Sequence, residues 1–462
     1  MTEIARAGST ARQNLQGVHE RTGPAAAGTL PRRLGMWSMA AIIMGTMIGS
    51  GIFRTPAQVA DLVGSVGAIT AVWIIGGLVT LCLALCLAEL GAMFPRAGGI
   101  YVYLHEAFGP VVAFVFGLTF LFVNPSQWAA ISLIFSEYLG SFVPLTDGGK
   151  RVAASGLILF VSVTNYFSVG FAAAIQNFAT SAKALALAAV AIIIFLLASG
   201  TTGALAQPME WSAPAIGVFG IALVAVLWPY EGVAGSCAIA GEVRDPARNV
   251  PRALILSVLI VMALYLLVNA AYLYVLPLET AAGSTLIAAD AMNSVTGASG
   301  ATVIAACVML STFGAVAATS ISDPRVFYAM ARDELFFRRI GAVHPRYATP
   351  HVAIALSGTL AIAYIWVRTF EQLAAQFVIG MWLFYTLAVV GLIVLRIRRP
   401  AAERPYRTWG YPLVPVVFVV GAGGLLLNSL WEQTEETAIS LVVILAAIPL
   451  YFLWQRLRTR RA

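Results

Sequence analysis

The chain has 462 residues, of which 60% are hydrophobic and only 11% are charged, and its formal net charge is +7. This composition excludes a soluble globular domain and is typical of a polytopic membrane protein. The positive charge does not indicate nucleic acid, because most Lys and Arg residues lie on alternate connecting segments. That distribution is the positive-inside pattern of a chain with both termini cytosolic.

Twelve apolar segments are long enough to cross a bilayer, which takes about 20 residues per helix. We predict an all-α fold with membrane spans at residues 36–66, 68–93, 110–140, 151–168, 171–198, 214–241, 252–276, 300–330, 350–367, 373–396, 411–430 and 437–455. An even number of spans agrees with two cytosolic termini. We therefore expect a multi-pass protein of the plasma (inner) membrane, surrounded by the lipid bilayer.

The two terminal segments and one long connection outside these spans are polar. Residues 1–34 contain no apolar stretch, so we expect a disordered cytosolic tail without a cleavable signal peptide. Residues 399–410 predict a cytosolic loop and residues 456–462 a basic cytosolic tail. Residues 96–107 are amphipathic but too short to cross, which favours an interfacial helix.

The first span contains three glycines in seven residues, Gly45 to Gly51, and each costs about 1 kcal/mol in a helix relative to Ala. We interpret this stretch as a break in the helix. Backbone groups freed inside a membrane must face a cavity or a ligand. The N–H groups of Ser50 and Gly51, which we expect to open the second half of the helix, suit an anion such as a carboxylate. The candidate site residues here are Thr46, Met47, Ile48, Gly49, Ser50 and Gly51.

Lys183 lies near the middle of the fifth span. A lone cation there costs about 2.5–3.5 kcal/mol on insertion scales, and its stem would hardly reach the interface from this depth. We therefore interpret Lys183 as a functional residue.

The sixth span contains a second interruption, Trp228-Pro229-Tyr230-Glu231-Gly232. A proline beside a carboxylate and a glycine is incompatible with a continuous membrane helix. Matching breaks in the first and sixth spans are typical of transporters built from inverted repeats of the LeuT type. We expect repeats of five spans at residues 36–198 and 214–396 within a core at 35–398, followed by two extra spans within 411–455. The candidate site residues here are Trp228, Tyr230, Glu231 and Gly232.

Four stretches resemble the amino acid–polyamine–organocation superfamily. They are the glycine-rich residues 45–56, AIAGEVRDPARNVPRAL at 238–254, residues 311–350, and NPSQWAAISLIFSEYL at 124–139, the last resembling the L-amino-acid-transporter branch. The resemblance implies sodium-independent secondary transport of amino acids by alternating access, through exchange or proton coupling. By similarity, the carbonyl groups of Met47, Trp228 and Glu231 hold the α-ammonium of the substrate.

The resemblance also gives roles to three further residues. The segment before Lys183 is similar to a segment of relatives whose lysine stands where sodium-driven members hold sodium. Ser311 and Thr312 are the expected oxygen partners of Lys183.

Animal members of the branch are tied to a heavy subunit through a Cys between their third and fourth helices. Residues 141–150 contain none, so we expect no covalent ancillary subunit and a monomer or homodimer.

The role of Glu231 has several interpretations. Its carboxylate could face the side chain of the substrate, carry a proton, or pair with a cation elsewhere. The first possibility keeps open an alternative function as an antiporter for cationic amino acids or polyamines. Trp228 and Trp128 could wall a pocket or act as gates.

Several charged residues follow the sixth span or lie at helix ends. Glu242, Asp245, Arg248, Asn249 and Arg252 predict a solvated loop, and pairing with Arg332 or Asp333 could form an inner gate. We assign Glu89 and Glu137, near span ends, to interfacial or packing roles.

Other functional classes are disfavoured. A channel would need a lined pore, and a membrane protease of the G-x-S-G type would need an embedded histidine, whereas all four histidines map to cytosolic segments or their edges. No phosphate-binding G-x-x-x-x-G-K-[ST] loop occurs. The four cysteines lie in apolar runs, so we expect no disulfide framework and no zinc site. With no catalytic motif recognised, we also expect no cofactor and no enzyme activity.

Overall fold

The computed structural model describes residues 32, 34–167, 169–198, 203–206, 215–337, 339–340, 344 and 349–459. The expected tail at 1–34 lies almost entirely outside these residues, as does the end of the basic tail at 456–462. Among the described residues every regular element is a helix, apart from one isolated bridge between Leu34 and Val243.

The helices of the first half are α2 (Met36–Met47), the 3-10 helix η1 (Gly51–Phe53), α3 (Thr55–Val63), α4 (Val66–Met93), α5 (Ile100–Phe108), α6 (Pro110–Val123), α7 (Pro125–Leu139), α8 (Asp147–Phe167) and α9 (Val169–Leu197). Those of the second half are η2 (Ala204–Ala206), α10 (Ile216–Leu227), α11 (Val233–Ser236), η3 (Cys237–Glu242), α12 (Pro246–Val275), α13 (Leu278–Gly283), α14 (Ile287–Thr296), α15 (Ala298–Ser322), α16 (Pro324–Arg332), α17 (His351–Val367), α18 (Phe370–Arg398), α19 (Leu413–Glu432) and α20 (Thr434–Thr459).

Seven of the described helical segments are long and apolar enough to cross a membrane, with α6–α7 and α15–α16 each counted as one. Shorter apolar helices, including α2 and α10, lie between them. The chain is therefore an all-helical, multi-pass membrane protein, while the count of twelve spans stays a prediction.

Local sequence signals set several helix boundaries. Gly64 ends α3 with φ +61°, and the Ser65 side chain then caps the start of α4 by accepting from the Ala68 N–H. Thr369 and Gln372 form a capping box at the start of α18. Proline occupies the first turn of α6, α7, α12 and α16, where its missing N–H costs nothing.

The charged loop predicted after the sixth span is wrong in part. Pro246 starts α12 six residues before the expected boundary, so Arg248, Asn249 and Arg252 belong to a helix. Charged residues in a first turn that extends beyond the apolar segment do not reveal a helix by hydropathy, whereas Pro246 is a helix-start signal.

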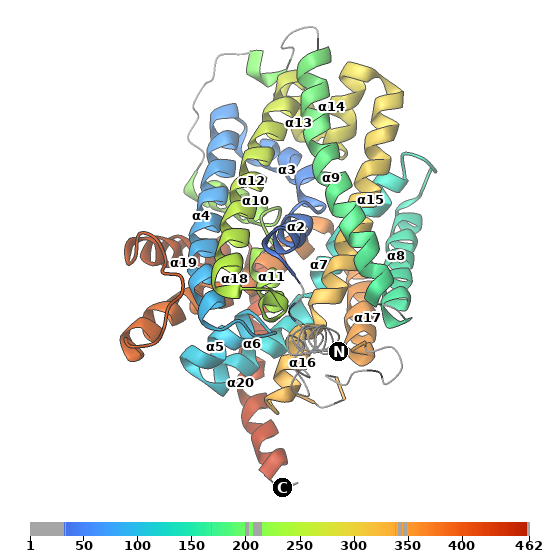
Figure 1. The fold of residues 1–462 in the computed structure, drawn as a ribbon. Helices are drawn as coiled ribbons and strands as arrows, with labels where there is room; N and C mark the ends of the chain where they lie inside the picture. Colours follow the sequence, from blue (N-terminus) through green and yellow to red (C-terminus); the bar gives the residue numbers. More distant parts are fainter. Residues whose placement is uncertain are drawn as a thin grey trace, which may run out of the picture.

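Three short helices differ from the expectation. The predicted interfacial helix forms as α5, but Tyr101, Tyr103 and Leu104 are buried by protein. The helices α13 and α14 were not expected, and they pack against α3 and α15 respectively. Figure 1 shows α3, α13 and α14 in the upper half of the molecule and α5 and α16 in the lower half.

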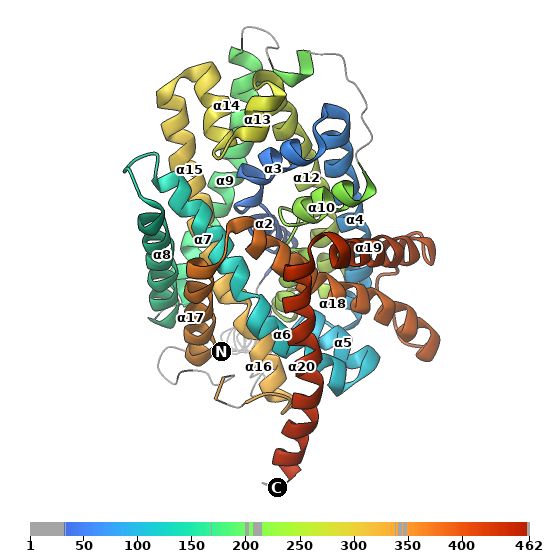
Figure 2. The ribbon, with the colours of Figure 1, turned by 180° about the vertical axis from the view of Figure 1, so that it is seen from behind.

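The interrupted helix α2 lies at the centre of the bundle. Figures 1 and 2 show it enclosed from opposite sides, with α9 and α12 on one side and α7 and α18 on the other. Its packing partners include α9, α11, α12 and α15. The helices α19 and α20 lie at the periphery, so the fold places the first interruption deep inside the protein (Figure 2).

Candidate functional site

The first span is interrupted where its glycines predict. The helix α2 ends at Met47, residues 48–50 leave the helix, and α3 begins only at Thr55 after the turn η1. Ser50 and Gly51, which we expected to open the second half of the helix, open the 3-10 turn η1 instead of the α-helix itself. Ser50 is 1% exposed, and among the described residues its Oγ has no hydrogen-bond partner.

The sixth span is interrupted at the predicted place too. The helix α10 ends at Leu227, and the chain turns through residues 228–232 before α11. Gly232 has φ +123°, and a Cβ there would lie 2.5 Å from Thr46 Oγ1. A side chain at this position would therefore be strained and would clash with the first interruption.

Tyr265 of α12 joins the two interruptions. Its hydroxyl is 2.7 Å from the Met47 carbonyl oxygen and 3.0 Å from that of Pro229, so the two carbonyls share its single O–H proton. The sequence reading missed this residue, although a tyrosine inside a membrane span needs a partner for its hydroxyl. Tyr230 packs against Tyr265, with ring centroids 5.2 Å apart, and donates to the Trp73 carbonyl. Its side chain thus belongs to an aromatic cluster beside the interruptions.

Two of the carbonyl groups expected to hold an ammonium already accept hydrogen bonds. The Met47 oxygen accepts from Gly49 N at 2.8 Å as well as from Tyr265, and the Trp228 oxygen accepts from Glu231 N at 3.0 Å. The Thr46 hydroxyl donates within its own helix and lies 3.4 Å from Ser236 Oγ.

Lys183 contacts the first interruption directly. Its side chain is 4% exposed, and its ammonium donates to the carbonyl of Gly45 in the last turn of α2. Within the described residues, the two expected partners of Lys183, Ser311 and Thr312, hydrogen-bond to other groups. Ser311 Oγ donates to the Ile48 carbonyl at 3.3 Å, and Thr312 Oγ1 donates to carbonyls of its own helix. Lys183 and Ser311 therefore hold α2 from two neighbouring helices.

Glu231 is buried at the second interruption. It is 7% exposed and accepts a hydrogen bond of 2.8 Å from the Tyr385 hydroxyl of α18. Among the described residues, Glu231 forms no ion pair with a cation. The neighbouring Trp228 packs edge-on against Phe370 and Phe377, also of α18. The residues of the second interruption thus face the first interruption on one side and α18 on the other.

Trp128 contacts an acid that the sequence reading did not single out. Its Nε1 donates to Asp323 Oδ2 at 2.9 Å, and Asn124 Nδ2 donates to the same oxygen at 2.5 Å. Asn124 and Asp323 each precede a proline, and these two dipeptides were the signal that could have drawn attention to them.

Ion pairs lie at both ends of the bundle. Near α3, Arg54 Nη2 is 2.9 Å from Glu371 Oε1. At the opposite end, Arg325 Nε is 2.7 Å from Glu242 Oε1, and the Tyr101 hydroxyl donates to Asp333. The expectation was that the charged segment from Glu242 to Arg252 pairs with Arg332 or Asp333. The pairing of Glu242 with Arg325 was not expected.

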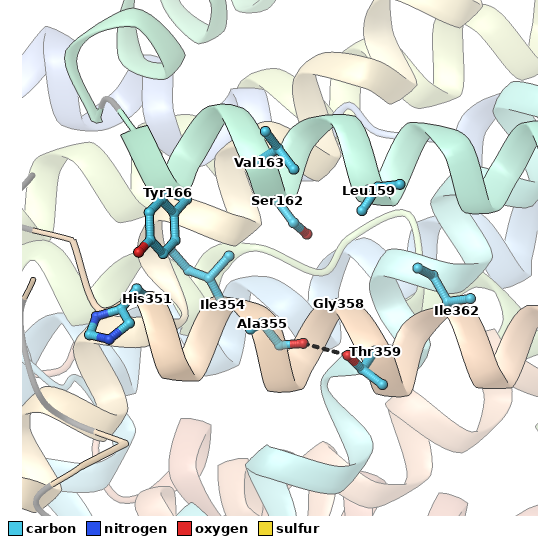
Figure 3. A pocket seen from close by; sticks show the side chains of 10 residues that line it. All are labelled: Leu159, Ser162, Val163, Tyr166, His351, Ile354, Ala355, Gly358, Thr359 and Ile362. Atoms are coloured by element: carbon cyan, nitrogen blue, oxygen red, sulfur yellow. Dashed lines mark hydrogen bonds between the residues drawn. The ribbon is translucent and has the colours of Figure 1, made fainter.

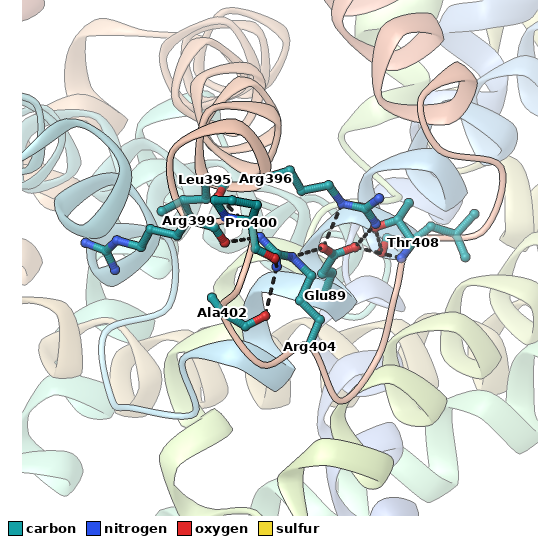
Figure 4. Close-up of polar contacts among 9 residues, drawn as sticks. Glu89, Leu395, Arg396, Arg399, Pro400, Ala402, Arg404 and Thr408 are labelled. Carbon is teal, nitrogen blue, oxygen red and sulfur yellow. Dashed lines mark hydrogen bonds and ion pairs between the residues drawn. The ribbon is translucent and has the colours of Figure 1, made fainter.

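Glu89 is a fully buried carboxylate rather than an interfacial one. It accepts from both Nε and Nη2 of Arg396, at 2.9 and 2.5 Å, and from the Thr408 N–H at 2.7 Å, with Arg404 Nε 3.4 Å away (Figure 4). These contacts fasten the segment after α18 to the end of α4.

Glu106 of α5 is a second carboxylate held by arginines. Partial burial raises the pKa of Glu106, but hydrogen bonds from Arg399 and Arg96 outweigh this effect and hold that pKa below its ordinary value.

A groove of about 360 Å³ lies between α8 and α17, away from the predicted site residues. Figure 3 shows its lining of mainly apolar side chains, with Tyr166 and His351 at one end. No group of three or more His, Cys, Asp or Glu residues suitable for a metal occurs in the part of the chain that the structure describes.

Comparison with known proteins gives one family and several relatives. The family model "Amino acid permease" matches residues 34–453. The chain is 33% identical to the b(0,+)-type amino acid transporter 1 of Homo sapiens over 439 residues, which cover 92% of this chain and 88% of the relative. It is 29% identical to the serine/threonine exchanger SteT of Bacillus subtilis (92% and 97% covered) and 30% identical to the human large neutral amino acids transporter small subunit 2 (92% and 81% covered).

Proposed function

This chain belongs to the amino acid permease family, and from that premise we propose that it moves amino acids across the membrane by alternating access, as an exchanger or a proton-coupled carrier that needs no sodium. The relatives are amino acid transporters rather than enzymes, and one is named as an exchanger. The observation that carries the proposal is the direct contact of two interrupted spans beside the Ser50 hydroxyl, which has no hydrogen-bond partner in the described part of the chain. Loose backbone ends at mid-membrane are suited to a small zwitterion.

We propose a LeuT-type architecture of twelve spans. The two repeats would be residues 36–198 and 214–396, within a transport core at 35–398, and α19 and α20 would be additions to it. Both termini, the segment 399–410 and the tail 456–462 would face the cytosol across the plasma (inner) membrane, which agrees with the placement of the Lys and Arg residues.

The substrate would bind between the interruptions. Its α-carboxylate would take the Ser50 hydroxyl and the N–H groups of Ser50 and Gly51, since these groups lie at the start of a helical turn. Its α-ammonium would lie against the carbonyls of Met47, Trp228 and Glu231, which requires a change in the hydrogen bonds that the first two now accept.

Lys183 would take the place of a sodium ion. Its ammonium already donates to the Gly45 carbonyl next to the first interruption. A cation fixed to the protein holds the end of α2 without a dissociable ion, so transport would be independent of sodium. Ser311 would contribute by fixing Ile48 from α15, and Thr312 would act through α15 itself.

A second candidate function is antiport of cationic amino acids or polyamines. It is favoured by Glu231, a buried carboxylate at the interruption that meets a tyrosine hydroxyl and no cation among the residues described. A cationic side chain of the substrate would supply the missing charge.

We expect no disulfide-linked partner, although one relative is named as a small subunit. The segment between α7 and α8 contains no cysteine. We propose a monomer or a homodimer.

The test is uptake of a panel of labelled amino acids into proteoliposomes without sodium, with and without internal amino acid. Saturable uptake stimulated by internal amino acid is the expected result. Absence of uptake for the whole panel, or a strict need for sodium, would overturn the proposal.

A further inference from the structure

A second pair of interruptions meets inside the bundle. Pro125 and Pro324 lack the N–H that a continuous helix needs, so hydrogen bonding is interrupted between α6 and α7 and between α15 and α16. The residues before them, Asn124 and Asp323, keep helical dihedral angles and hydrogen-bond each other at 2.5 Å. In the proposed repeats, these two are the third span of each half.

The carboxylate of Asp323 is held by neutral groups. Asn124 Nδ2 and Trp128 Nε1 donate to its Oδ2, and Ser322 Oγ lies 3.4 Å from its Oδ1. Asp323 is 8% exposed, and Asn124 and Trp128 are 3% and 0% exposed. A buried carboxylate usually has a cation as its partner. Within the described residues, no Lys, Arg or His forms an ion pair with Asp323.

The charged and titratable side chains around Asp323 do not neutralise it. Glu231 and Tyr385 are titratable groups within the range of its charge. Two cations on these elements have partners elsewhere: Arg325 of α16 pairs with Glu242, and Lys183 of α9, which packs against α15, donates to Gly45.

We propose that Asp323 binds and releases a coupling proton, with Asn124 and Trp128 as positioning residues. An ionised carboxylate is costly in a membrane without a counter-charge, and a second carboxylate nearby adds repulsion. A proton would add to a carboxylate oxygen of Asp323 from water on one side of the membrane and leave to water on the other, with no other bond changed.

The position of Asp323 links this proton to the movement of the helices. The half-helices α7 and α15 pack together on one side of the cluster formed by Asn124, Trp128 and Asp323, and α6 and α16 pack together on the other. Loss of charge at Asp323 weakens its hydrogen bonds from Asn124 and Trp128. These bonds join the span of α6 and α7 to the span of α15 and α16. The inference rests on the proposed function and decides between its two forms, exchange and proton coupling, in favour of coupling.

The experiment uses the purified full chain in proteoliposomes that contain a pH-sensitive dye. Two quantities are measured for one amino acid of the panel: counterflow at equal pH, and accumulation driven by an inward proton gradient without internal amino acid. For the wild type, we expect gradient-driven accumulation accompanied by acidification of the lumen. In Asp323→Asn, the ratio of gradient-driven accumulation to counterflow should fall by about tenfold or more, because no titratable group remains in the cluster with Asn124 and Trp128.

Three further variants sharpen the result. Asp323→Glu should restore the ratio to within about threefold of the wild type, since it keeps a titratable carboxylate. Trp128→Phe keeps the ring but removes the donor to the ionised carboxylate, so the pH profile of accumulation should move to higher pH. Asp61→Asn, at an exposed residue of α3, is the matched control and should leave both quantities unchanged.

The outcomes separate the two proposals. Wild-type counterflow without gradient-driven accumulation or acidification overturns the proton site and leaves the proposed function standing. Loss of gradient drive in Glu231→Gln but not in Asp323→Asn overturns it as well, because the proton would then bind Glu231. Absence of counterflow in the wild type for every amino acid overturns both. If Asp323→Asn does not fold, the dye signal of the wild type and an unmoved pH profile in Trp128→Phe remain able to overturn the proposal.

Discussion

A Cβ added to Gly51 would lie 2.6 Å from Cγ and 2.8 Å from Cα of Pro229, so the two interrupted spans touch here without room for a methyl group. The contact involves backbone as well as side-chain atoms, so it cannot be relieved by turning one side chain. Overpacking of this kind costs about 1–3 kcal/mol. The distance between the two interruptions is therefore set by a glycine.

Gly51→Ala should abolish or strongly reduce uptake, because it pushes apart the interruptions that would hold the substrate. The melting temperature of the purified protein should fall as well. Gly235→Ala is the matched control, since a Cβ at Gly235 meets nothing within 4 Å. Normal uptake in Gly51→Ala would show that the contact of the interruptions is unimportant for transport.

Lys183→Ala removes a charged hydrogen bond to the Gly45 carbonyl, a kind of bond that contributes about 1.5–3 kcal/mol. Counterflow should fall by about tenfold or more, and added sodium should not be required by the wild type. Lys150→Ala, at a partly exposed lysine in the first turn of α8, is the control. Full activity of Lys183→Ala would exclude a coupling role for Lys183.

Glu231→Gln tests where this carboxylate points. If it faces the substrate, the affinity for lysine or arginine should fall far more than that for neutral amino acids, because a buried counter-charge is lost. Tyr385→Phe removes only the hydrogen bond to Glu231, which contributes about 0.5–1.5 kcal/mol. Equal effects of Glu231→Gln on cationic and neutral substrates would reject the cationic alternative.

Glu89→Ala should destabilise the protein strongly. It leaves the guanidinium groups of Arg396 and Arg404 without their carboxylate at a buried site, and breaking a buried pair costs about 3–5 kcal/mol. The melting temperature in detergent measures the effect. Glu435→Gln, which breaks an exposed pair with Arg368, should change stability by no more than about 1 kcal/mol. Similar melting temperatures for both variants would contradict the structural role of Glu89.

The cluster of charged residues around Glu106 predicts a pH dependence. Hydrogen bonds from Arg399 and Arg96 overcome the effect of burial, so the pKa of Glu106 is lower in the folded than in the unfolded protein. Its stabilising contribution is therefore complete above the ordinary pKa of a glutamate and is lost as the pH falls through the folded-state pKa. The wild type should melt at a higher temperature than Glu106→Gln at pH 7, and the difference should shrink on acidification. A difference that grows toward low pH would reverse this sign, and Glu403→Gln, at an exposed residue, serves as the control.

The sequence alone determined the class of the protein and the positions of its two deepest irregularities. Long apolar segments with few charges exclude a soluble fold, and the clustered glycines of residues 45–51 and the Pro-Tyr-Glu-Gly stretch after Trp228 interrupt a helix wherever it is placed. Lys183 was also identifiable, because a lone charge in an apolar span is costly in any arrangement.

Only the tertiary structure decided which groups meet. Tyr265 joins the two interruptions, Asp323 meets Asn124 and Trp128, and Glu89 meets Arg396 across residues that lie far apart in the chain. Helix breaks and hydropathy are local properties of the backbone, and they carry no record of the face that a helix turns toward its neighbours. The partner of a buried polar group is fixed by how the helices pack, which is why the charge of Asp323 gained meaning only when its surroundings were known.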